Sequence, residues 1–485
     1  MTNVISFVAA GVIVLLGLRL APESGFRLAR RRASVGLVAT AGFTVMGWIV
    51  ASAELLPGGL LDSNDLVDAS ASGFLGIVPS MICLIGLVAI ALSDSISHSV
   101  STLRRILFLL AIAMVFVGSS EPLVLAACWV LSPIVVWTEL RSDVKYSAAS
   151  RLFAIFHVPS VVLFFAAVVA HRLGDLAFVS VAVLVAVGIR EAVVPGHSWF
   201  LKFVEEAPMG LVVAFVAPQL GVYAHIELLT HAIPVDLTQV VAGLGALTAI
   251  WASALGVVQT SARRALAYLM MSQTGLIAFG IEGTSGVAFA GSLLAWQVLA
   301  LATTGFAMTL SALEARRGEL SLGEFSGCFS RTPRMAGGFL MMGLASVGFP
   351  LTLGFVAEDL LVQGSVQQFP VLSFVLIVAT ALNGMNVVRS FFHLFSGRRE
   401  HSGEADLTNR ESWSLSAVLL ILLAGGLVPS AITSREFRKP TIESKSDHVE
   451  FGRVGGLTPS VAVEGGIGSV FRDRKVPSWE EGEAG

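Results

Sequence analysis

Two pairs of adjacent charged residues interrupt long apolar segments of the chain, and their side chains suit proton or ion transfer. The pairs are Arg190 with Glu191 and Glu358 with Asp359. Pro195 follows the first pair and Pro350 precedes the second, and proline kinks or ends a helix because it lacks the N–H donor. Backbone groups freed at a break in an apolar environment can bind water or ions. The pattern predicts two similar ion-handling sites at broken helices.

Four further polar residues lie within or beside the apolar segments and complete the candidate pathway. They are Glu121, Gln219, His225 and Glu227. A charged side chain at the centre of a membrane-spanning helix costs roughly 2.5–3.5 kcal/mol, so its presence there indicates function. The alternative is that the charged pairs lie near the ends of their helices, where long side chains reach water. In that case His225 and Glu227 line a hydrated rim.

The elements that must position these residues are membrane-spanning helices. The chain has 485 residues, of which 55% are hydrophobic and 13% charged, and its mean hydropathy is +0.80. Soluble domains carry about 25% charged residues, so the composition excludes a cytosolic enzyme and a disordered protein. The net charge of −3 gives no basic surface for nucleic acid. We therefore expect an all-α, polytopic protein embedded in the lipid bilayer.

Fourteen apolar segments come close to the length of about 20 residues that spans a bilayer. They are 3–21, 35–55, 73–93, 105–119, 121–138, 152–171, 176–194, 208–232, 237–258, 265–281, 285–313, 335–363, 370–395 and 413–433. Lysines and arginines between them fall in odd-numbered loops, with the exception of Arg172. The positive-inside rule then makes the odd loops cytoplasmic and puts both termini outside. The expected location is the plasma membrane of a prokaryote.

We divide the chain into three regions. Residues 1–100 hold the first three spanning segments, residues 101–434 hold all the candidate residues, and residues 435–485 form a polar, glycine-rich tail. A tail of this kind buries little apolar surface and is predicted to be flexible. The three cysteines are far apart and form no metal or disulfide pattern. With no flavin, nucleotide, haem or iron–sulfur motif present, we expect no cofactor and no redox site in this chain.

The two charged pairs fall in the seventh and twelfth spanning segments, an odd offset of five. Such an offset is what two five-helix repeats of inverted topology would give. Broken helices in corresponding positions of two repeats mark the ion site in many transporters. The sequence therefore predicts two inverted repeats, each with a broken helix.

Three stretches carry a resemblance to a known family. They are residues 190–208 (REAVVPGHSWFLKFVEEAP), 263–275 (RRALAYLMMSQTG) and 348–359 (GFPLTLGFVAED). Their order and content resemble the antiporter-like membrane subunits of respiratory complex I and of Mrp-type cation/proton antiporters. The resemblance implies a subunit that moves protons or monovalent cations through half-channels lined by buried ionisable residues and water. It also implies other membrane or peripheral subunits in a hetero-oligomer.

The chain departs from the family pattern where the pattern has its proton carriers. The family's fifth-span glutamate falls on Cys128, its seventh-span lysine on Arg190 and its eighth-span lysine on Gln219. Arginine keeps its proton because its pKa exceeds about 12, and glutamine does not ionise. Arg190 is therefore expected to act as a fixed counter-charge for Glu191 or to hold a neighbouring carboxylate in its ionised form. Only Glu358 keeps an ionisable residue that the family permits at its place.

Two functions remain open at this point. The first is proton or cation translocation through the candidate pathway. The second, favoured by the lost lysines and glutamate, is a non-pumping or coupling partner subunit in a larger complex. Relatives of this fold that work with a peripheral zinc protein in proton-driven inorganic-carbon uptake are an example of the second. A redox enzyme in its own right is a third class for which the sequence offers no motif.

Overall fold

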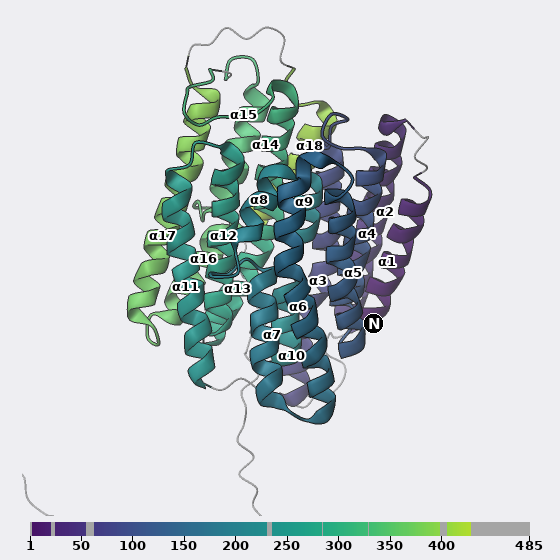
Figure 1. Cartoon of the computed structure of the whole chain (residues 1–485), viewed down its shortest axis with the longest axis vertical. Helices are drawn as coiled ribbons and strands as arrows, with labels where there is room; N and C mark the ends of the chain where they lie inside the picture. Colours follow the sequence, from purple (N-terminus) through teal and green to yellow (C-terminus); the bar gives the residue numbers. More distant parts are fainter. Residues whose placement is uncertain are drawn as a thin grey trace, which may run out of the picture. The chain divides into compact units, whose positions relative to one another are not determined.

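The computed structural model describes residues 2–20, 25–54, 63–229, 235–283, 285–327, 329–397 and 405–427. These residues form a bundle of helices that run roughly side by side (Figure 1). The described part of the chain contains no β-strand, which confirms the predicted all-α class. The tail predicted at 435–485 lies outside the described residues.

The helices of the first half of the chain cover residues 2–229. They are α1 (Thr2–Leu18), α2 (Phe26–Glu54), α3 (Ser63–Leu92), α4 (Val100–Val117), α5 (Pro122–Leu140), α6 (Ser147–Leu173), α7 (Leu176–Arg190), α8 (Ser198–Glu206), α9 (Met209–Val216) and α10 (Leu220–Leu229). A 3₁₀ turn at Val144–Tyr146 leads into α6.

The helices of the second half cover residues 235–427. They are α11 (Val235–Val257), α12 (Ala262–Ile281), α13 (Gly286–Val298), α14 (Thr304–Arg317), α15 (Pro333–Ser346), α16 (Leu353–Ser365), α17 (Pro370–Phe395) and α18 (Asn409–Leu427). A π-helical turn, Leu299–Thr303, joins α13 to α14 without a break.

Within the described residues, each of the fourteen predicted segments overlaps one helix or consecutive helices, and the predicted positions 21, 55, 230–232 and 428–433 lie outside them. The segment 208–232 is divided into α9 and α10, and the segment 335–363 into α15 and α16. Among the described residues, eight helical stretches are long and apolar enough to cross a membrane, and three shorter apolar helices accompany them. The number of spans and the side of each loop stay predictions.

Local signals in the sequence place several helix ends. Ser99 and Thr102 form a reciprocal capping box at the start of α4, which satisfies two free backbone donors. Pro122 occupies the first turn of α5, where its missing N–H costs nothing. Gly174 ends α6 in the left-handed region at φ 81°, a conformation that glycine adopts without strain. These tight ends allow α6 and α7 to pack as neighbours.

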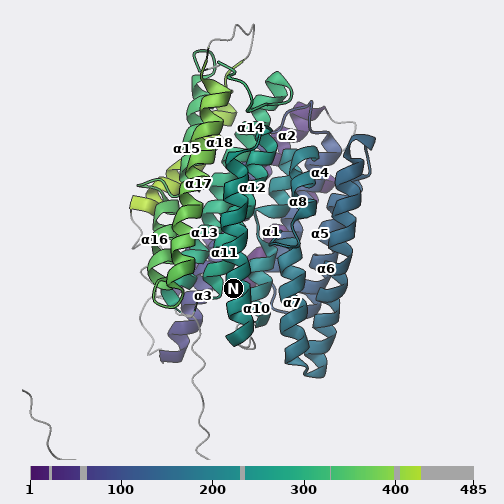
Figure 2. The same cartoon turned by 60° about the vertical axis from the view of Figure 1, so that its left-hand side comes forward.

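Two sets of five helical segments repeat one packing pattern, where a segment is one helix or two consecutive helices. The first set is α4, α5, α6, α7 with α8, and α9 with α10; the second is α11, α12, α13 with α14, α15 with α16, and α17. In the set from α4 to α10, the first segment α4 packs on the last one, and α6 packs along both α7 and α8. In the set from α11 to α17, α11 packs on α17, while α13 and α14 pack along α16 and α15. Figures 1 and 2 both show the second set beside the first. The pattern agrees with the predicted five-helix repeats, and their inversion stays a prediction.

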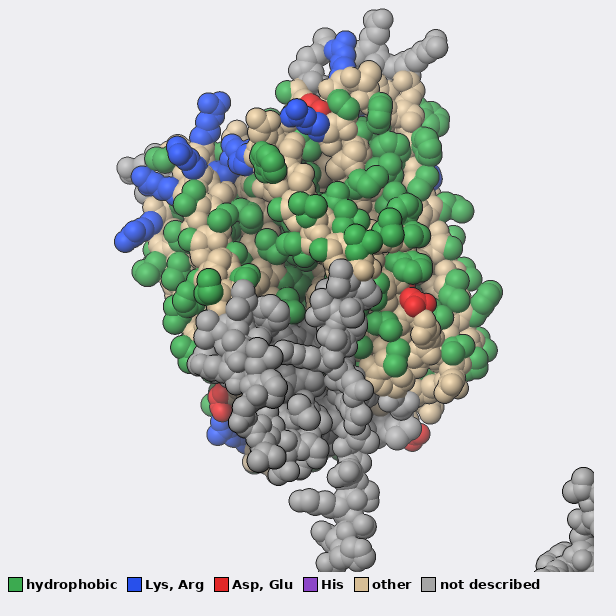
Figure 3. Space-filling view, turned by 180° about the vertical axis from the view of Figure 1, so that it is seen from behind, with side chains coloured by type: hydrophobic (Ala, Val, Ile, Leu, Met, Phe, Trp, Pro, Cys, Tyr) green, Lys and Arg blue, Asp and Glu red, His purple; other side chains and the backbone are tan. Residues whose placement is uncertain are grey.

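The outer surface of the bundle is apolar over its middle. On α6, Ile155, Val158, Val162 and Phe165 follow helical spacing, and each is more than half exposed. Figure 3 shows hydrophobic side chains over the middle of one face, with most of its visible Lys and Arg side chains towards the upper end. A large exposed apolar surface of this kind fits contact with lipid rather than with water.

Candidate proton-transfer site

The first helix break comprises residues 191–197, between α7 and α8. Helix α7 ends at Arg190, and Ala192 takes a positive φ of 56°, which turns the chain out of the helix. The Val194–Pro195 peptide bond is cis. The indole Nε1 of Trp199 donates a hydrogen bond of 2.9 Å to the carbonyl of Ile189 at the helix end, which also accepts the backbone N–H of Ala192 at 3.3 Å. The break predicted beside Pro195 is present.

Arg190 is buried against aromatic rings. Its guanidinium carbon lies 4.7 Å from the ring centroid of Trp129 in α5 and 4.4 Å from that of Phe215 in α9. Among the described residues, its two terminal nitrogens have no hydrogen-bond partner. A desolvated cation over an aromatic face gains about 2 kcal/mol or more. The positive charge is therefore held in place by rings and does not depend on a hydrogen-bonded carboxylate.

Glu191 turns away from its neighbour and caps another helix. Its side chain is buried, and Oε1 accepts a hydrogen bond of 2.8 Å from the backbone N–H of Gly221 in the first turn of α10. Free N–H groups and the helix dipole favour a carboxylate there. A side chain at position 221 would collide with the carboxylate. Glycine at this position thus lets Glu191 reach the backbone of α10.

Gln219 lies at a second interruption, between α9 and α10. It has a positive φ of 47° and is fully buried. Within the described part of the chain, neither its amide oxygen nor its amide nitrogen has a hydrogen-bond partner. Sequence analysis treated 208–232 as one span and missed this break, although Pro218 was the available signal.

His225 meets a residue that sequence analysis did not single out. Its Nε2 lies 3.2 Å from Oε1 of Glu282, the residue that directly follows α12. The two side chains are 11% and 2% exposed, so the pair is buried. Glu282 stands in the predicted loop after segment 265–281 and carried no further signal, because its partner is distant in sequence.

The second helix break comprises residues 347–352, between α15 and α16. Gly348 and Leu351 both adopt positive φ there, 73° and 74°. The carboxylate of Glu358 packs directly on Gly348, where a side chain would collide with it. Thr380 of α17 donates a hydrogen bond to the same carboxylate. The structure thus places Glu358 at the break that Pro350 predicted.

A glutamine connects this break to the neighbouring helices. Gln273 of α12 donates a hydrogen bond of 2.5 Å from Nε2 to the carbonyl of Ser346, the last residue of α15. Its Oε1 accepts a bond of 2.7 Å from the hydroxyl of Thr303 in the π-helical turn. A cavity of about 20 Å³ borders Gln273, Ser346 and Glu358. One water molecule fits a space of that size.

Three of the predicted residues lie apart from the buried groups. Glu121 precedes α5 with its side chain 55% exposed, and Oε1 pairs with Arg172 at 2.9 Å. Asp359 is exposed and accepts a bond from Gln363. Glu227 is half-buried and is hydrogen-bonded to Ser120. These side chains do not join the two breaks.

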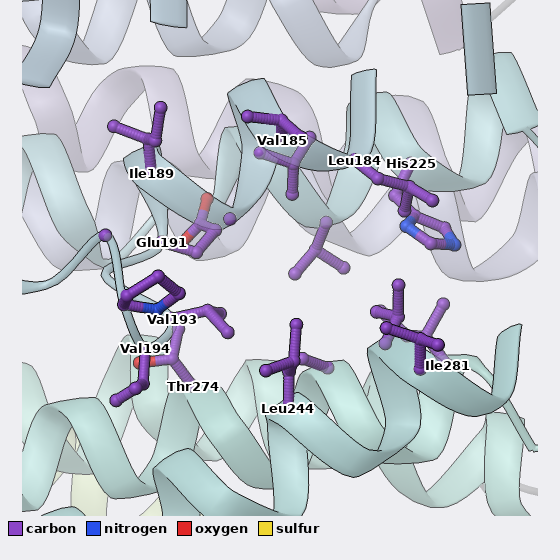
Figure 4. Close-up of a pocket in the computed structure, with 18 of the residues that line it drawn as sticks. Leu184, Val185, Ile189, Glu191, Val193, Val194, His225, Leu244, Thr274 and Ile281 are labelled. Atoms are coloured by element: carbon purple, nitrogen blue, oxygen red, sulfur yellow. The ribbon is translucent and has the colours of Figure 1, made fainter. Parts of the chain in front are cut away.

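Three of the remaining predicted residues, Glu191, Gln219 and His225, line one cleft. We call it the α7–α11 cleft; it has a volume of about 600 Å³, and Glu191, Gln219, His225 and Thr274 are among the polar residues on its walls. Figure 4 shows Glu191 and His225 towards opposite ends, with Val185 and Leu244 on the walls between them. Among the described residues, no group of three or more His, Cys, Asp or Glu side chains is placed to hold a metal ion.

Comparisons with known proteins relate the chain to one family. Residues 123–383 match the family model described as NADH:quinone oxidoreductase/Mrp antiporter, transmembrane. The chain is 22% identical over 259 residues to NADH-quinone oxidoreductase subunit M of Rickettsia prowazekii, covering 52% of this chain and 53% of that protein. It is 25% identical over 280 residues to an NAD(P)H-quinone oxidoreductase chain 4 of Thermosynechococcus vestitus, covering 54% and 53%. The matches thus span about half the length of these curated relatives.

Solved structures share the fold over most of the chain. A chain of respiratory complex I from Thermus thermophilus superimposes with a TM-score of 0.77 at 20% identity, covering 90% of this chain and 98% of that one. A chain of the Mrp complex from a Dietzia species gives 0.77 at 16% identity, covering 90% and 96%. At these identities the likeness concerns the fold.

Proposed function

Because this chain belongs to the NADH:quinone oxidoreductase/Mrp antiporter transmembrane family, we propose that it is a subunit that translocates protons, or a monovalent cation, across a membrane. The observation that carries the proposal is that each helix break holds one carboxylate packed against a glycine. Glu191 is bonded at Gly221, and Glu358 packs on Gly348. A carboxylate that sits where the backbone is unwound can exchange a proton with enclosed water.

The proposed path has two proton carriers and one fixed charge. Glu191 and Glu358 take up and release protons. Arg190 keeps its charge and favours the ionised form of a nearby carboxylate. Gln219 cannot ionise and contributes hydrogen bonding only. Glu121 and Asp359 are exposed to solvent or lipid and are left out of the path.

The proposal includes partners and a location. The structural relatives belong to a respiratory complex I and to an Mrp complex, each an assembly of several chains. By the same inference this chain works in a hetero-oligomer with other membrane or peripheral subunits. The distribution of basic loops favours a prokaryotic plasma membrane with the odd loops in the cytoplasm.

Proton flux into proteoliposomes that contain the full chain tests the proposal. An imposed membrane potential drives the flux, and an enclosed pH-sensitive dye reports it. Glu191→Gln and Glu358→Gln keep the shape of each side chain, but the amide cannot take up or release a proton. We expect each substitution to lower the flux by roughly a hundredfold.

Glu319→Gln is the matched control, because this exposed carboxylate follows α14 outside both breaks. Its flux should equal that of the wild type. A folded wild-type protein with no flux above empty liposomes contradicts the proposal. Wild-type flux from both glutamine variants at the breaks contradicts it as well.

A second candidate function, a non-pumping coupling subunit, rests on Arg190 and Gln219. Both occupy places where the family has lysines, and neither changes its charge in the working range. This function predicts no flux from the isolated chain. Capture of the tagged chain from membranes would then yield a stable partner subunit, whose co-reconstitution restores transport.

A further inference from the structure

One buried pair of proton-exchanging side chains lies outside both helix breaks. Nε2 of His225 and Oε1 of Glu282 are 3.2 Å apart, the distance of an ion pair when the ring is protonated. The histidine belongs to α10, the last segment of the first five-helix set, and the glutamate follows α12 in the second set. The pair therefore joins the two sets by a side-chain contact.

The chemistry of this pair differs from that of Arg190. Imidazole is the side chain that changes charge most readily near neutral pH, and a carboxylate can take its proton over one hydrogen bond. Removing a carboxylate from water costs several kcal/mol, which a hydrogen-bonded partner must offset. Glu282 at 2% exposure thus has a partner that can hand it a proton.

The face of α10 connects this pair to the first helix break. Gly221, which donates to Glu191, and His225 are four residues apart and so lie on one face of the helix. The α7–α11 cleft follows that face, with Glu191 and His225 towards its two ends (Figure 4). Gln219 at the same cleft cannot carry a proton, and Tyr223 of α10 is not among the cleft residues, so the exchangeable side chain that α10 presents to the cleft is His225.

Building on the proposed function, we propose that His225 and Glu282 form a relay that carries protons between the Glu191 break and the membrane face at which α10 and α12 end. The imidazolium gives its Nε2 proton to Oε1 of Glu282. The ring becomes neutral, and the carboxylate becomes a carboxylic acid. Glu282 then releases the proton at the end of α12, and the ring takes its next proton from the cleft.

Proton flux through Glu282→Gln and His225→Gln variants in proteoliposomes tests the relay. Each variant keeps a hydrogen-bonding side chain of similar size, and we expect each to lower the flux roughly tenfold or more. The double variant should be no slower than either single one, because the two residues act as one unit. Asp236→Asn, an exposed carboxylate in the first turn of α11, should keep the wild-type rate.

Infrared difference spectroscopy on the full chain gives a readout that needs no transport. On a step in pH, a carboxyl band assigned to Glu282 should appear, vanish in Glu282→Gln and shift in His225→Gln. A purely structural pair would leave the spectra of these variants unchanged. Unchanged spectra, or wild-type flux through Glu282→Gln, would overturn the relay.

The outcomes separate the relay from the proposed function. If Glu191→Gln stops the flux while Glu282→Gln does not, translocation stands and the relay is wrong. If the folded wild type shows no flux but the Glu282 band responds to pH and depends on His225, the pair exchanges protons and the translocating function is wrong. If the folded wild type shows neither proton flux nor a pH-dependent Glu282 band, both the relay and the translocating function are wrong.

Discussion

The two helix breaks hold their carboxylates by different means. At the first break the carboxylate of Glu191 follows a buried cation in sequence and bonds to the start of α10, while Trp129 and Phe215 cover the guanidinium of Arg190. At the second break, Glu358 forms no ion pair with any described residue. Its surroundings are a glycine, a threonine hydroxyl and the hydrogen bonds of Gln273.

This difference separates a fixed charge from an adaptable polar network. Aromatic faces cannot reorient to follow a moving proton, so Arg190 gives Glu191 a constant field. Hydroxyl and amide groups can rotate or accept in place of donating, so the network around Glu358 can serve both protonation states. The second break is therefore better suited to a carboxylate that changes its protonation state, and the first to a charge that stays fixed.

The largest expected effect concerns the glycine at the second break. Gly348→Ala puts a Cβ where φ is 73° and where the carboxylate of Glu358 now lies. We expect a loss of about 2–3 kcal/mol in the free energy of unfolding, from backbone strain and a displaced side chain. Proton flux should fall with it. Thermal unfolding in detergent and flux in proteoliposomes measure the two effects.

Gly196→Ala is the counterpart at the first break. Its Cβ would lie 3.1 Å from the Cα of Ile189, a tight approach, but Gly196 lacks the positive φ of Gly348. The expected loss is below about 1 kcal/mol. Equal losses from the two alanine variants would show that the strain at Gly348 is not special to the Glu358 site.

Two buried glutamines make the next comparison. Gln273→Leu removes two hydrogen bonds and leaves the carbonyl of Ser346 without its donor, which we expect to cost about 2 kcal/mol. Gln219→Leu leaves no described partner unpaired and relieves the burial of an amide, so stability should stay equal or rise.

Chemical or thermal unfolding of both leucine variants measures this difference, and the matched substitution keeps the change in size and polarity the same. A large loss in Gln219→Leu would mean that this amide is hydrogen-bonded in the membrane-embedded protein. The contrast between Gln273, which is hydrogen-bonded at the second break, and Gln219, which has no described hydrogen-bond partner, would then fail.

A change of cation tests the fixed charge. Arg190→Lys keeps a positive charge but loses the planar stack on Trp129 and Phe215, at a cost of about 1 kcal/mol. A desolvated lysine can release its proton, so flux should fall more steeply towards alkaline pH than in the wild type. Arg389→Lys is the control, because Arg389 donates to the backbone carbonyl of Gln259 away from both breaks. Identical pH profiles for Arg190→Lys and wild type would show that the fixed charge is unnecessary.

Sequence reasoning reached the helices and the two charged breaks because local rules govern them. Hydropathy marked the described helices apart from α8, which lies between two predicted segments, and Pro195 and Pro350 marked the breaks. It placed Glu358 at its break, since glycine and proline nearby signal an unwound backbone. These features depend on residues close together in the chain.

Contacts between distant segments were beyond that reasoning. Nothing near Glu282 in the sequence points to His225, 57 positions away by residue number, and only the tertiary fold brings the residue after α12 to α10. Likewise no local signal shows that Trp129 and Phe215 enclose Arg190, or that Glu191 bonds to Gly221. Tertiary packing decides these pairs, and a single sequence carries no record of it.

The smallest expected effect belongs to a residue that charge and position alone made a candidate. Glu121→Gln removes the pair with Arg172, in which both side chains are more than half exposed. Exposed ion pairs contribute about 0–1 kcal/mol, so the free energy of unfolding should change by less than about 0.5 kcal/mol. The flux should also stay at the wild-type level, because solvent or lipid headgroups can replace the partner of an exposed cation. A loss of flux comparable to that of Glu191→Gln would extend the path to the start of α5, and the contrast between two buried breaks would then be incomplete.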